Sequence, residues 1–310
     1  FNNMYTPMYS FLNFNIISHK LLSIKNPVNC FIFFGLLFFN DGICQSDTVS
    51  PSLKDKNIIF VYGGMKGHSP KESADLFIPI LEKEGANVKV YDNFNIYEDP
   101  VIMKETDLII QAFTSAFTPE DQQMNNKQFK GLQIAILNGT GFSGWHGGIG
   151  DSNPLNRRYQ FMVGGHFIAH PGNMTNFEVK IIDNYDPITR NISNFLMNDT
   201  EQYYMLIDPN IKVLAVSEFT NKTYKKLNTL ELEQRNYINI DVGNDIKGSV
   251  MPVVWKKNYG KGRIFYSSIG HYLTDFDIPE VMTIQMRGFR WASEGKYSKK
   301  EKTITPIYMK

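Results

Sequence analysis

The stretch Asn57-Ile58-Ile59-Phe60-Val61-Tyr62 decides the fold, because a short, mostly apolar and β-branched run is typical of a strand buried on both faces. The glycine-containing loop Gly63–His68 follows it. Ser69-Pro70-Lys71-Glu72 then predicts a helix start with a capping serine, a proline in the first turn and a capping-box glutamate. Gly85 ends the helical spacing of apolar residues. This part of the chain is therefore read as a strand followed by a helix.

The same alternation continues toward the middle of the chain. Val88–Tyr91, Asp107–Gln111 and Leu132–Leu137 are expected to be strands, and a helix is expected from Thr118 to about Gly131. Strands that alternate with helices form mostly parallel sheets with helices on both faces. The sequence therefore predicts an α/β fold with a doubly wound, mostly parallel sheet flanked by helices.

The second half contains fewer helices. Its expected strands are Phe177–Asp183, Lys212–Phe219, Val250–Lys256 and Arg263–Ser267. The last two are joined by a short glycine-containing segment, which predicts a C-terminal β-hairpin. Residues 278–294 are expected to form a closing helix.

The N-terminal segment, residues 1–45, has the features of a secretory leader. Lysines precede the apolar run Cys30–Phe39, and small residues lie near Cys44. The run is too short to span a membrane. We expect cleavage after Cys44 and a secreted or periplasmic protein without a transmembrane span. A lipid anchor on Cys44 is the less favoured alternative.

The remaining boundaries follow from this leader. Residues 46–56 are expected to be a linker, residues 57–295 a single domain and residues 296–310 a basic, solvated tail. Both cysteines of the chain lie in the leader. A mature chain without cysteine excludes a disulfide framework, a thiolate metal site and a cysteine nucleophile.

Charge limits the partners of this protein. The net charge is +1, and no long basic block precedes the tail. Nucleic acid is therefore not an expected partner. The pattern leaves the oligomeric state open, with a homo-oligomer among the alternatives.

Histidines after residue 45 occur in turn-like stretches rather than within helices. His68, His146 and His271 each follow an expected strand, so they should meet at the carboxyl edge of the sheet, where α/β proteins bind ligands. Without cysteine, a divalent metal such as zinc would be held by histidine and carboxylate. These three are the candidate metal ligands, and His170 is a fourth. The alternative is that the histidines bind substrate hydroxyls directly.

The segment Gly139–Gly144 matches the spacing G-x-G-x-x-G but indicates no dinucleotide site. More glycines follow it instead of a helix, and no acidic residue lies about twenty positions later. No nucleotide cofactor is therefore expected. Ser143 also fails as a hydrolase nucleophile, because Trp145 occupies the position where a second glycine is needed. A glycine-rich loop that approaches a ligand or another strand is the better interpretation.

Polar and aromatic residues around this loop suggest a binding site. Trp145, His146, Gly147 and Asp151 place an aromatic ring, an imidazole and a carboxylate close together, a combination suited to sugars. The alternative is a core tryptophan with a turn-capping aspartate.

Two further groups are weaker signals when taken alone. His166 and His170 have the spacing of a helical metal pair, although flanking glycine and proline make a regular helix doubtful. Glu201 beside Tyr203 is a candidate acid or base. Without further context, a surface glutamate next to two packed tyrosines is the better explanation of the second group.

Several of these pieces together resemble the ThuA-like (trehalose-utilization) family, whose fold is similar to the class I glutamine amidotransferases. The matching segments are Gly139–Asp151, Gly164-Gly165-His166-Phe167 with His170-Pro171, Asp186-Pro187-Ile188-Thr189, Glu201-Gln202-Tyr203, Pro252–Trp255, Gly260–His271 and Arg287–Ala292. The resemblance implies a flavodoxin-like α/β sandwich and a link to sugar metabolism. The amidotransferase cysteine is missing, so glutamine hydrolysis is not carried over. The family's usual Asp-Glu pair is Thr200-Glu201 here, which keeps one carboxylate.

The leading hypothesis is a carbohydrate-active enzyme that acts on a sugar or keto-sugar by proton transfer, with or without a metal. His146 and Glu201 are the candidate acid and base, and Asp151 is expected to orient one of them. Trp145, Gly147, His166 and Tyr203 are expected to contact the substrate. The rival is a non-catalytic sugar-binding module that uses the same pocket, and a third interpretation is an interaction protein that has lost the site.

Overall fold

The computed structural model describes residues 51–116, 118–172, 174–220 and 246–299. The expected leader, residues 1–45, and positions 300–310 of the expected tail lie outside these residues. Leu53, in the expected linker, is fully buried in the hydrophobic core. The folded unit therefore begins before residue 57. The tail also starts later than expected, because the Tyr297 hydroxyl donates a hydrogen bond to Asp107 Oδ1 at 2.6 Å.

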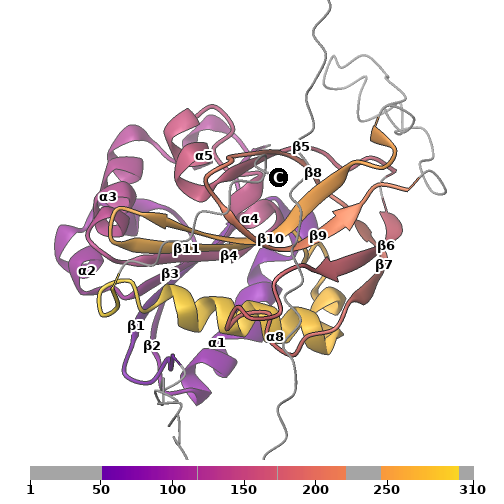
Figure 1. Cartoon of the computed structure of the whole chain (residues 1–310). Helices are drawn as coiled ribbons and strands as arrows, with labels where there is room; N and C mark the ends of the chain where they lie inside the picture. The colour runs from indigo at the N-terminus through magenta and orange to yellow at the C-terminus, as the bar shows by residue number, and fades with distance from the viewer. Residues whose placement is uncertain (1–50, 117, 173, 221–245, 300–310) are drawn as a thin grey trace, which may run out of the picture. The chain divides into compact units, whose positions relative to one another are not determined.

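Short helices connect the strands (Figure 1). The α-helices are α1 (Pro70–Lys83), α2 (Pro100–Glu105), α3 (Asn126–Leu137), α4 (His146–Gly150), α5 (Arg157–Val163) and α8 (Pro279–Ala292). Single turns of 3-10 helix are η1 (Lys66–His68), η2 (Asn95–Glu98), η3 (Glu120–Gln122) and η4 (Leu273–Asp277).

The main sheet has the order β2-β1-β3-β4-β11-β10-β9-β6-β7. Its strands are β1 (Asn57–Gly64), β2 (Asn87–Tyr91), β3 (Leu108–Thr114), β4 (Gly141–Trp145), β6 (Met174–Ile181), β7 (Phe195–Glu201), β9 (Lys212–Glu218), β10 (Val250–Tyr259) and β11 (Gly262–Ser267). From β2 to β11 the neighbours run parallel, and from β11 to β7 they run antiparallel. The α/β prediction is confirmed, and so is the hairpin, here β10–β11. The antiparallel part extends well beyond that hairpin.

Helices cover both faces of this sheet, as Figure 1 shows. Phe77 of α1 and Phe289 of α8 are fully buried on one face. Leu132 of α3 and Met162 of α5 are buried in a second cluster on the other face. Two apolar layers therefore fix the sheet between helices, as the doubly wound prediction requires.

The expected fourth strand, Leu132–Leu137, is wrong, because these residues are the second half of helix α3. That helix starts where the Asn125 side chain accepts hydrogen bonds from the backbone N–H groups of Lys127 and Gln128. It continues through Gly131 and ends at Leu137. The strand that follows is β4, which occupies part of the glycine-rich segment that we expected to be a loop.

Two other local expectations also differ from the structure. Ser69 precedes α1 as expected, but its backbone is left-handed with φ +46° and its side chain makes no capping hydrogen bond. Residues 165–169, which include His166, form the strand β5 (Gly165–Ala169), which pairs with β8 (Tyr204–Ile207) in a second, two-stranded sheet. His166 and His170 therefore do not lie on one helix, in agreement with the flanking glycines and proline that made a regular helix doubtful.

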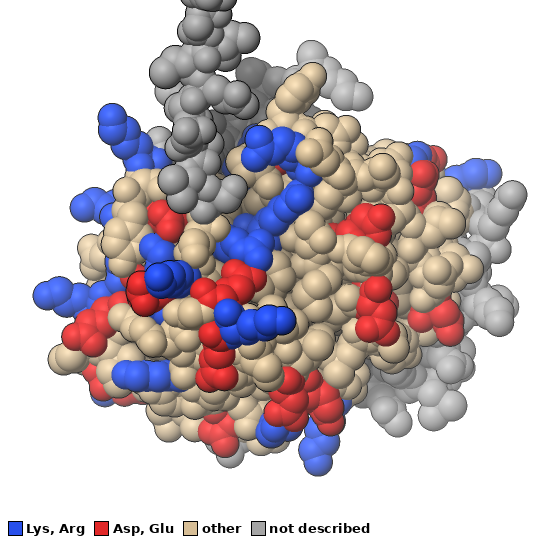
Figure 2. All heavy atoms as spheres, turned by 90° about the horizontal axis from the view of Figure 1, so that it is seen from below, with Lys and Arg blue, Asp and Glu red and all other residues tan. Residues whose placement is uncertain are grey.

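The charged surface is mixed rather than basic. On the face shown in Figure 2, Lys and Arg side chains lie beside Asp and Glu over much of the surface, and no broad basic area is visible. Within the described part of the chain, no helix has the length and apolar character that crossing a membrane requires.

Candidate functional site

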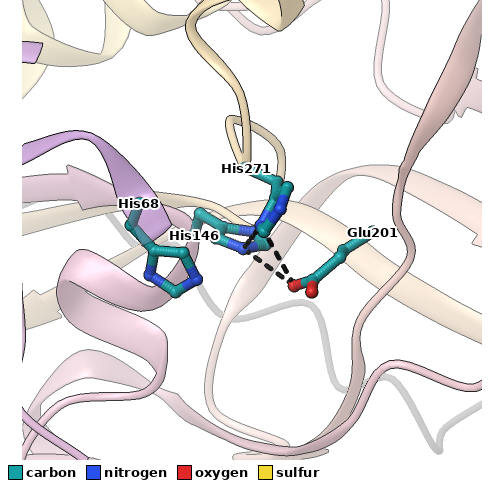
Figure 3. Close-up of side chains that lie close together, drawn as sticks. All are labelled: His68, His146, Glu201 and His271. Carbon is teal, nitrogen blue, oxygen red and sulfur yellow. Dashed lines mark hydrogen bonds and ion pairs between the residues drawn. The ribbon is translucent and has the colours of Figure 1, made fainter. Parts of the chain in front are cut away.

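Three histidines meet at the carboxyl edge of the parallel strands (Figure 3). His68 ends η1, which follows β1, while His146 comes directly after β4. His271 lies in the loop after β11. Because β1, β4 and β11 are parallel members of one sheet, their carboxyl ends lie at the same edge.

Glu201 completes the cluster from the antiparallel part of the sheet. It is the last residue of β7, and its carboxylate faces His146 and His271 in Figure 3. One ligand atom from each of His68, His146, Glu201 and His271 lies within 4.8 Å of the other three. The cluster thus joins segments that are far apart in the sequence.

His146 is held in a defined orientation and tautomer. Its backbone has φ +45° at the turn from β4 into α4. Its ring Nδ1 lies 3.0 Å from the Ser268 carbonyl oxygen, which can only accept, so Nδ1 carries the proton and donates it. In the neutral ring, Nε2 then carries the lone pair and points into the cluster. The Ser268 carbonyl therefore has the orienting role that we expected of Asp151.

Three ligand atoms form a nearly equilateral triangle. Nε2 of His146 lies 3.1 Å from Oε2 of Glu201 and 3.1 Å from Nδ1 of His271. The third edge, from Nδ1 of His271 to the same Glu201 oxygen, is 3.3 Å. Ligands held about 2.0 to 2.2 Å from one zinc ion lie about 3.0 to 3.6 Å apart, so the triangle has the dimensions of a coordination face.

Burial controls the charge of these groups. It lowers the pKa of the His146 imidazole, and Glu201 only partly opposes this effect. Burial lowers the pKa of His68 to about 3, with His146 adding to the effect. Burial alone would raise the pKa of Glu201, but the neighbouring His146 and His271 rings hold it well below its usual range. Near neutral pH, the site therefore presents His68 and His146 as neutral imidazoles and Glu201 as a carboxylate, the protonation states that a divalent cation needs.

Tyr203 closes one side of the site. Its hydroxyl lies 2.8 Å from His146 Nε2 and donates to that lone pair, and the two ring centroids are 4.0 Å apart. Burial raises the pKa of Tyr203 well above its ordinary value, so the hydroxyl keeps its proton. The hydroxyl can satisfy His146 only while no cation occupies the same lone pair.

His68 reaches the cluster because Gly147 leaves room for it. The Nδ1 of His68 lies 2.8 Å from the Thr114 hydroxyl oxygen, and its ring centroid is 4.8 Å from that of His146. A Cβ atom at Gly147 would lie 2.5 Å from the His68 ring and 2.8 Å from the Thr114 oxygen. We expected Gly147 to contact substrate, but its evident role is to let a histidine approach.

The other expected site residues lie around the cluster or away from it. His170 is placed beside the outer oxygen of Glu201, with Nε2 3.6 Å from Oε1. His166 lies half-buried on β5 and is not among the grouped ligand atoms. Asp151 is buried after α4, and its charge contributes to the raised pKa of Tyr203.

Trp145 is part of the core rather than the site. Its side chain is 3% exposed and packs at ring centroid distances of 4.7 Å from Phe77 and 5.5 Å from Phe276. Trp145 is the last residue of β4 and faces the core, whereas the turn into α4 at His146 directs the next side chain into the site. Its expected role as a platform for a sugar ring is therefore withdrawn, and the alternative of a core tryptophan holds.

Sequence reasoning missed a second group of supporting residues. Thr114 orients His68, the Ser268 carbonyl orients His146, and Asp275 accepts a hydrogen bond from the Thr200 hydroxyl at 2.8 Å. Thr114 could have been found, because it lies shortly after the predicted strand Asp107–Gln111, at the sheet edge where the candidate histidines were expected. The other contacts join distant segments, and no local motif marks them.

Fold and site together define a class: an α/β protein with a buried histidine–glutamate cluster at the carboxyl edge of its parallel strands. A family model described as trehalose utilisation matches residues 57–292. The chain belongs to this ThuA family.

Two solved structures of ThuA-like proteins agree with this assignment at the level of the fold. A ThuA-like protein from Bacteroides uniformis is 17% identical, with a TM-score of 0.60 over 78% of this chain and 92% of that one. A ThuA-like protein from Parabacteroides merdae is 15% identical, with a TM-score of 0.55 over 80% and 93%. A glutamine amidotransferase from Thermotoga maritima is 10% identical, with a TM-score of 0.40 over 78% and 99%. No curated protein matches the chain.

Proposed function

We propose that this protein is a secreted or periplasmic carbohydrate-active enzyme that acts on a sugar or keto-sugar by proton transfer, assisted by a divalent cation such as zinc. His146, Glu201 and His271 would hold the cation, with His68 as the fourth ligand. The observation that carries the proposal is the triangle of lone-pair atoms with edges of 3.1, 3.1 and 3.3 Å. A bound cation would supply electrophilic polarisation of a substrate oxygen or a water molecule of lowered pKa.

This assignment changes the roles given to individual residues. As a ligand, His146 cannot also serve as the base, because its one lone pair is committed. Two groups remain to hold or move a proton at the edge of the cluster. The His170 imidazole lies 3.6 Å from Glu201 Oε1 and is partly exposed, and the Tyr203 hydroxyl is within the site. Glu201 keeps its carboxylate form because hydrogen bonds lower its pKa.

The structure favours an enzyme over the alternative of a sugar-binding module. Burying several titratable groups together disfavours their charged forms and costs stability, and such groups cluster at catalytic sites. A binding module needs only aromatic faces and hydrogen bonds. The expected aromatic face, Trp145, is in the core. The side chains that remain in the cluster are histidines and a glutamate, which are suited to catalysis.

Metal analysis of protein purified without a His-tag tests the proposal. We expect about one equivalent of a divalent transition metal, given the high affinity of three-ligand sites. Glu201→Gln should lose it, whereas Glu218→Gln, at the exposed end of β9, should retain it. Turnover assays on disaccharides and their keto derivatives would compare wild type with His146→Ala. Less than about a tenth of an equivalent in wild-type protein from metal-replete growth would contradict the metal site. Sugar binding without turnover, unaffected by His146→Ala, would support the binding module.

A further inference from the structure

A second cavity lies at the opposite edge of the sheet from the histidine cluster. It has a volume of about 740 Å³ and is lined by residues of η2, α2, α3 and the turn before β4. Thr140, in its lining, directly precedes β4, so the cavity is at the amino ends of the parallel strands. Its volume is in the range of small-molecule sites, about 300 to 1,000 Å³. We call it the α2–α3 groove.

The floor of the α2–α3 groove is apolar. Tyr97, Met103 and Ala135 line it and are buried. Ile134 of α3 also lines it and is 48% exposed. An apolar floor within a concave site is suited to an apolar group of a ligand.

The rim of the groove is basic. Lys104, Lys127, Lys130 and Lys296 line it, against Glu98 as the one carboxylate in the lining. Glu98 forms an ion pair with Lys127, and its charge is therefore already offset. The remaining positive charge of the groove would favour an anion.

Lys296 shows that this basic rim is more than a set of solvated surface lysines. Its side chain is half-buried, and burial lowers the pKa of its ammonium group. One of its N–H groups donates to the Lys104 carbonyl oxygen at 2.6 Å. Lys296 also forms a long ion pair with Asp107, whose Oδ1 lies 3.8 Å away and accepts a hydrogen bond from the Tyr297 hydroxyl as well. A partly desolvated ammonium in this position would be stabilised by a further anionic partner.

The shape of the groove depends on a close helix contact. Gly131 lines it, and a Cβ atom at that position would lie 1.8 Å from the Tyr97 carbonyl oxygen. The glycine therefore lets α3 pack directly on η2 at one end of the groove. This contact fixes the wall that carries Lys127, Lys130 and Ile134.

We propose that the α2–α3 groove binds a small amphiphilic anion, an apolar chain or ring that carries one carboxylate or phosphate group. The apolar body would lie on Tyr97, Met103 and Ile134, and the anionic group would face the lysines of the rim. The site is separate from the histidine cluster and does not depend on the function proposed for it.

Calorimetric titration with decanoate and decyl phosphate tests this proposal, and the two arms identify the preferred head group. We expect saturable binding of one equivalent of at least one of them, and none of decyltrimethylammonium. The pair Lys104→Glu and Lys130→Glu should weaken binding about tenfold or more, because it reverses two rim charges. Lys83→Glu with Lys89→Glu makes the same charge change on α1 and β2, and should leave binding unchanged.

A second matched pair tests the apolar floor. Ile134→Ser removes an aliphatic group from the groove, whereas Leu137→Ser changes a similarly exposed residue of α3 outside its lining. Only the first should weaken binding, by about tenfold for the lost apolar contact. The proposal is overturned if neither anion binds saturably, if decyltrimethylammonium binds equally well, or if the control variants weaken binding as much as the groove variants.

Discussion

His146 has a backbone conformation that side chains rarely adopt. Its φ of +45° lies in the left-handed region, at the point where β4 turns into α4. Such a residue costs about 1 to 3 kcal/mol and persists where the surroundings impose it, often at functional sites. The turn aims the imidazole at Glu201 and His271, away from the strand. The strained backbone of His146 thus occurs where its imidazole is directed into the site at the edge of the sheet.

Gly147 offers a sharp test of the cluster at the level of one residue. Gly147→Ala places a Cβ atom 2.5 Å from the His68 ring, so the ring must move away from the other ligands. We expect zinc affinity to fall about tenfold or more, as for other losses of ligand support. A competition titration with a chromophoric chelator measures this change.

The neighbouring loop supplies the control for this substitution. Gly67 directly precedes His68, has no positive φ and has open space where a Cβ would be. Gly67→Ala should therefore leave zinc affinity at the wild-type value. Equal affinities for wild type and both alanine variants would show that His68 does not depend on the space at Gly147.

At the level of elements, one hydrogen bond joins the two halves of the site. The Thr200 hydroxyl, at the end of β7, donates to Asp275 Oδ2 of η4 at 2.8 Å. Glu201 follows Thr200, and His271 lies just before η4. The bond therefore helps to set the distance between two candidate ligands. Asp275 also supplies, from another segment, a carboxylate close to where the family's usual Asp-Glu pair has threonine.

Removal of this bond should loosen the site without removing a ligand. Thr200→Val takes away the donor and should weaken zinc binding about tenfold, since support residues of metal sites have effects of 10- to 100-fold. Thr200→Ser keeps a hydroxyl and should restore most of the affinity. Chelator competition, with thermal melting as a check on folding, distinguishes the outcomes. If valine and serine variants bind zinc equally, the hydrogen bond does not position the ligands.

The helix α3 and the strand β4 show where local sequence reasoning fails. The apolar, β-branched run Leu132–Leu137 has a strand-like composition, and Gly131 resembles a helix stop. Gly131 is instead required where α3 packs on the Tyr97 carbonyl. The true strand contains Gly141 and Gly144, because Cβ atoms there would lie 2.3 and 2.4 Å from backbone oxygens. Tertiary packing requires glycine at these positions, and strand propensity does not take such packing into account.

The candidate site was easier to anticipate than these elements. The rule that parallel strands end at one edge groups His68, His146 and His271 whatever the register of each strand. It also places His146 correctly although the strand before it was misassigned. The rule could not place Trp145 on the core side, because that depends on which residue of β4 is the last in the strand. The contacts of Ser268 and Asp275 depend on loop paths that no periodicity encodes.

At the scale of the whole molecule, the buried histidine should make stability depend on pH. His68 has an ordinary pKa of 6.5 and a folded pKa of about 3. Between these values the unfolded chain binds more protons than the folded one, so stability decreases as the pH is lowered. In metal-free protein, the His68 contribution should fall by about 2 kcal/mol between pH 7 and pH 5. The lowered pKa of Glu201 acts in the same direction below its ordinary value of 4.5.

Urea unfolding at several pH values measures this effect. His68→Asn removes the titrating group and should flatten the decline between pH 7 and pH 5. His166→Asn provides a comparison and should flatten the decline less, because this histidine lies outside the cluster and only partial burial lowers its pKa. Parallel stability curves for wild type and His68→Asn would contradict the prediction.

Trp145 ends β4 and His146 is the next residue, and this adjacency has a consequence for local unfolding of the protein. The tryptophan lies in the aromatic core, and the next residue is a candidate ligand. Local openings that expose binding loops usually occur at the weakly packed margins of a fold. Here the amide hydrogens up to Trp145 belong to β4, a central strand between β3 and β11, and His146 directly follows it. They should exchange with solvent only when the whole domain unfolds, so the site is as long-lived as the fold itself.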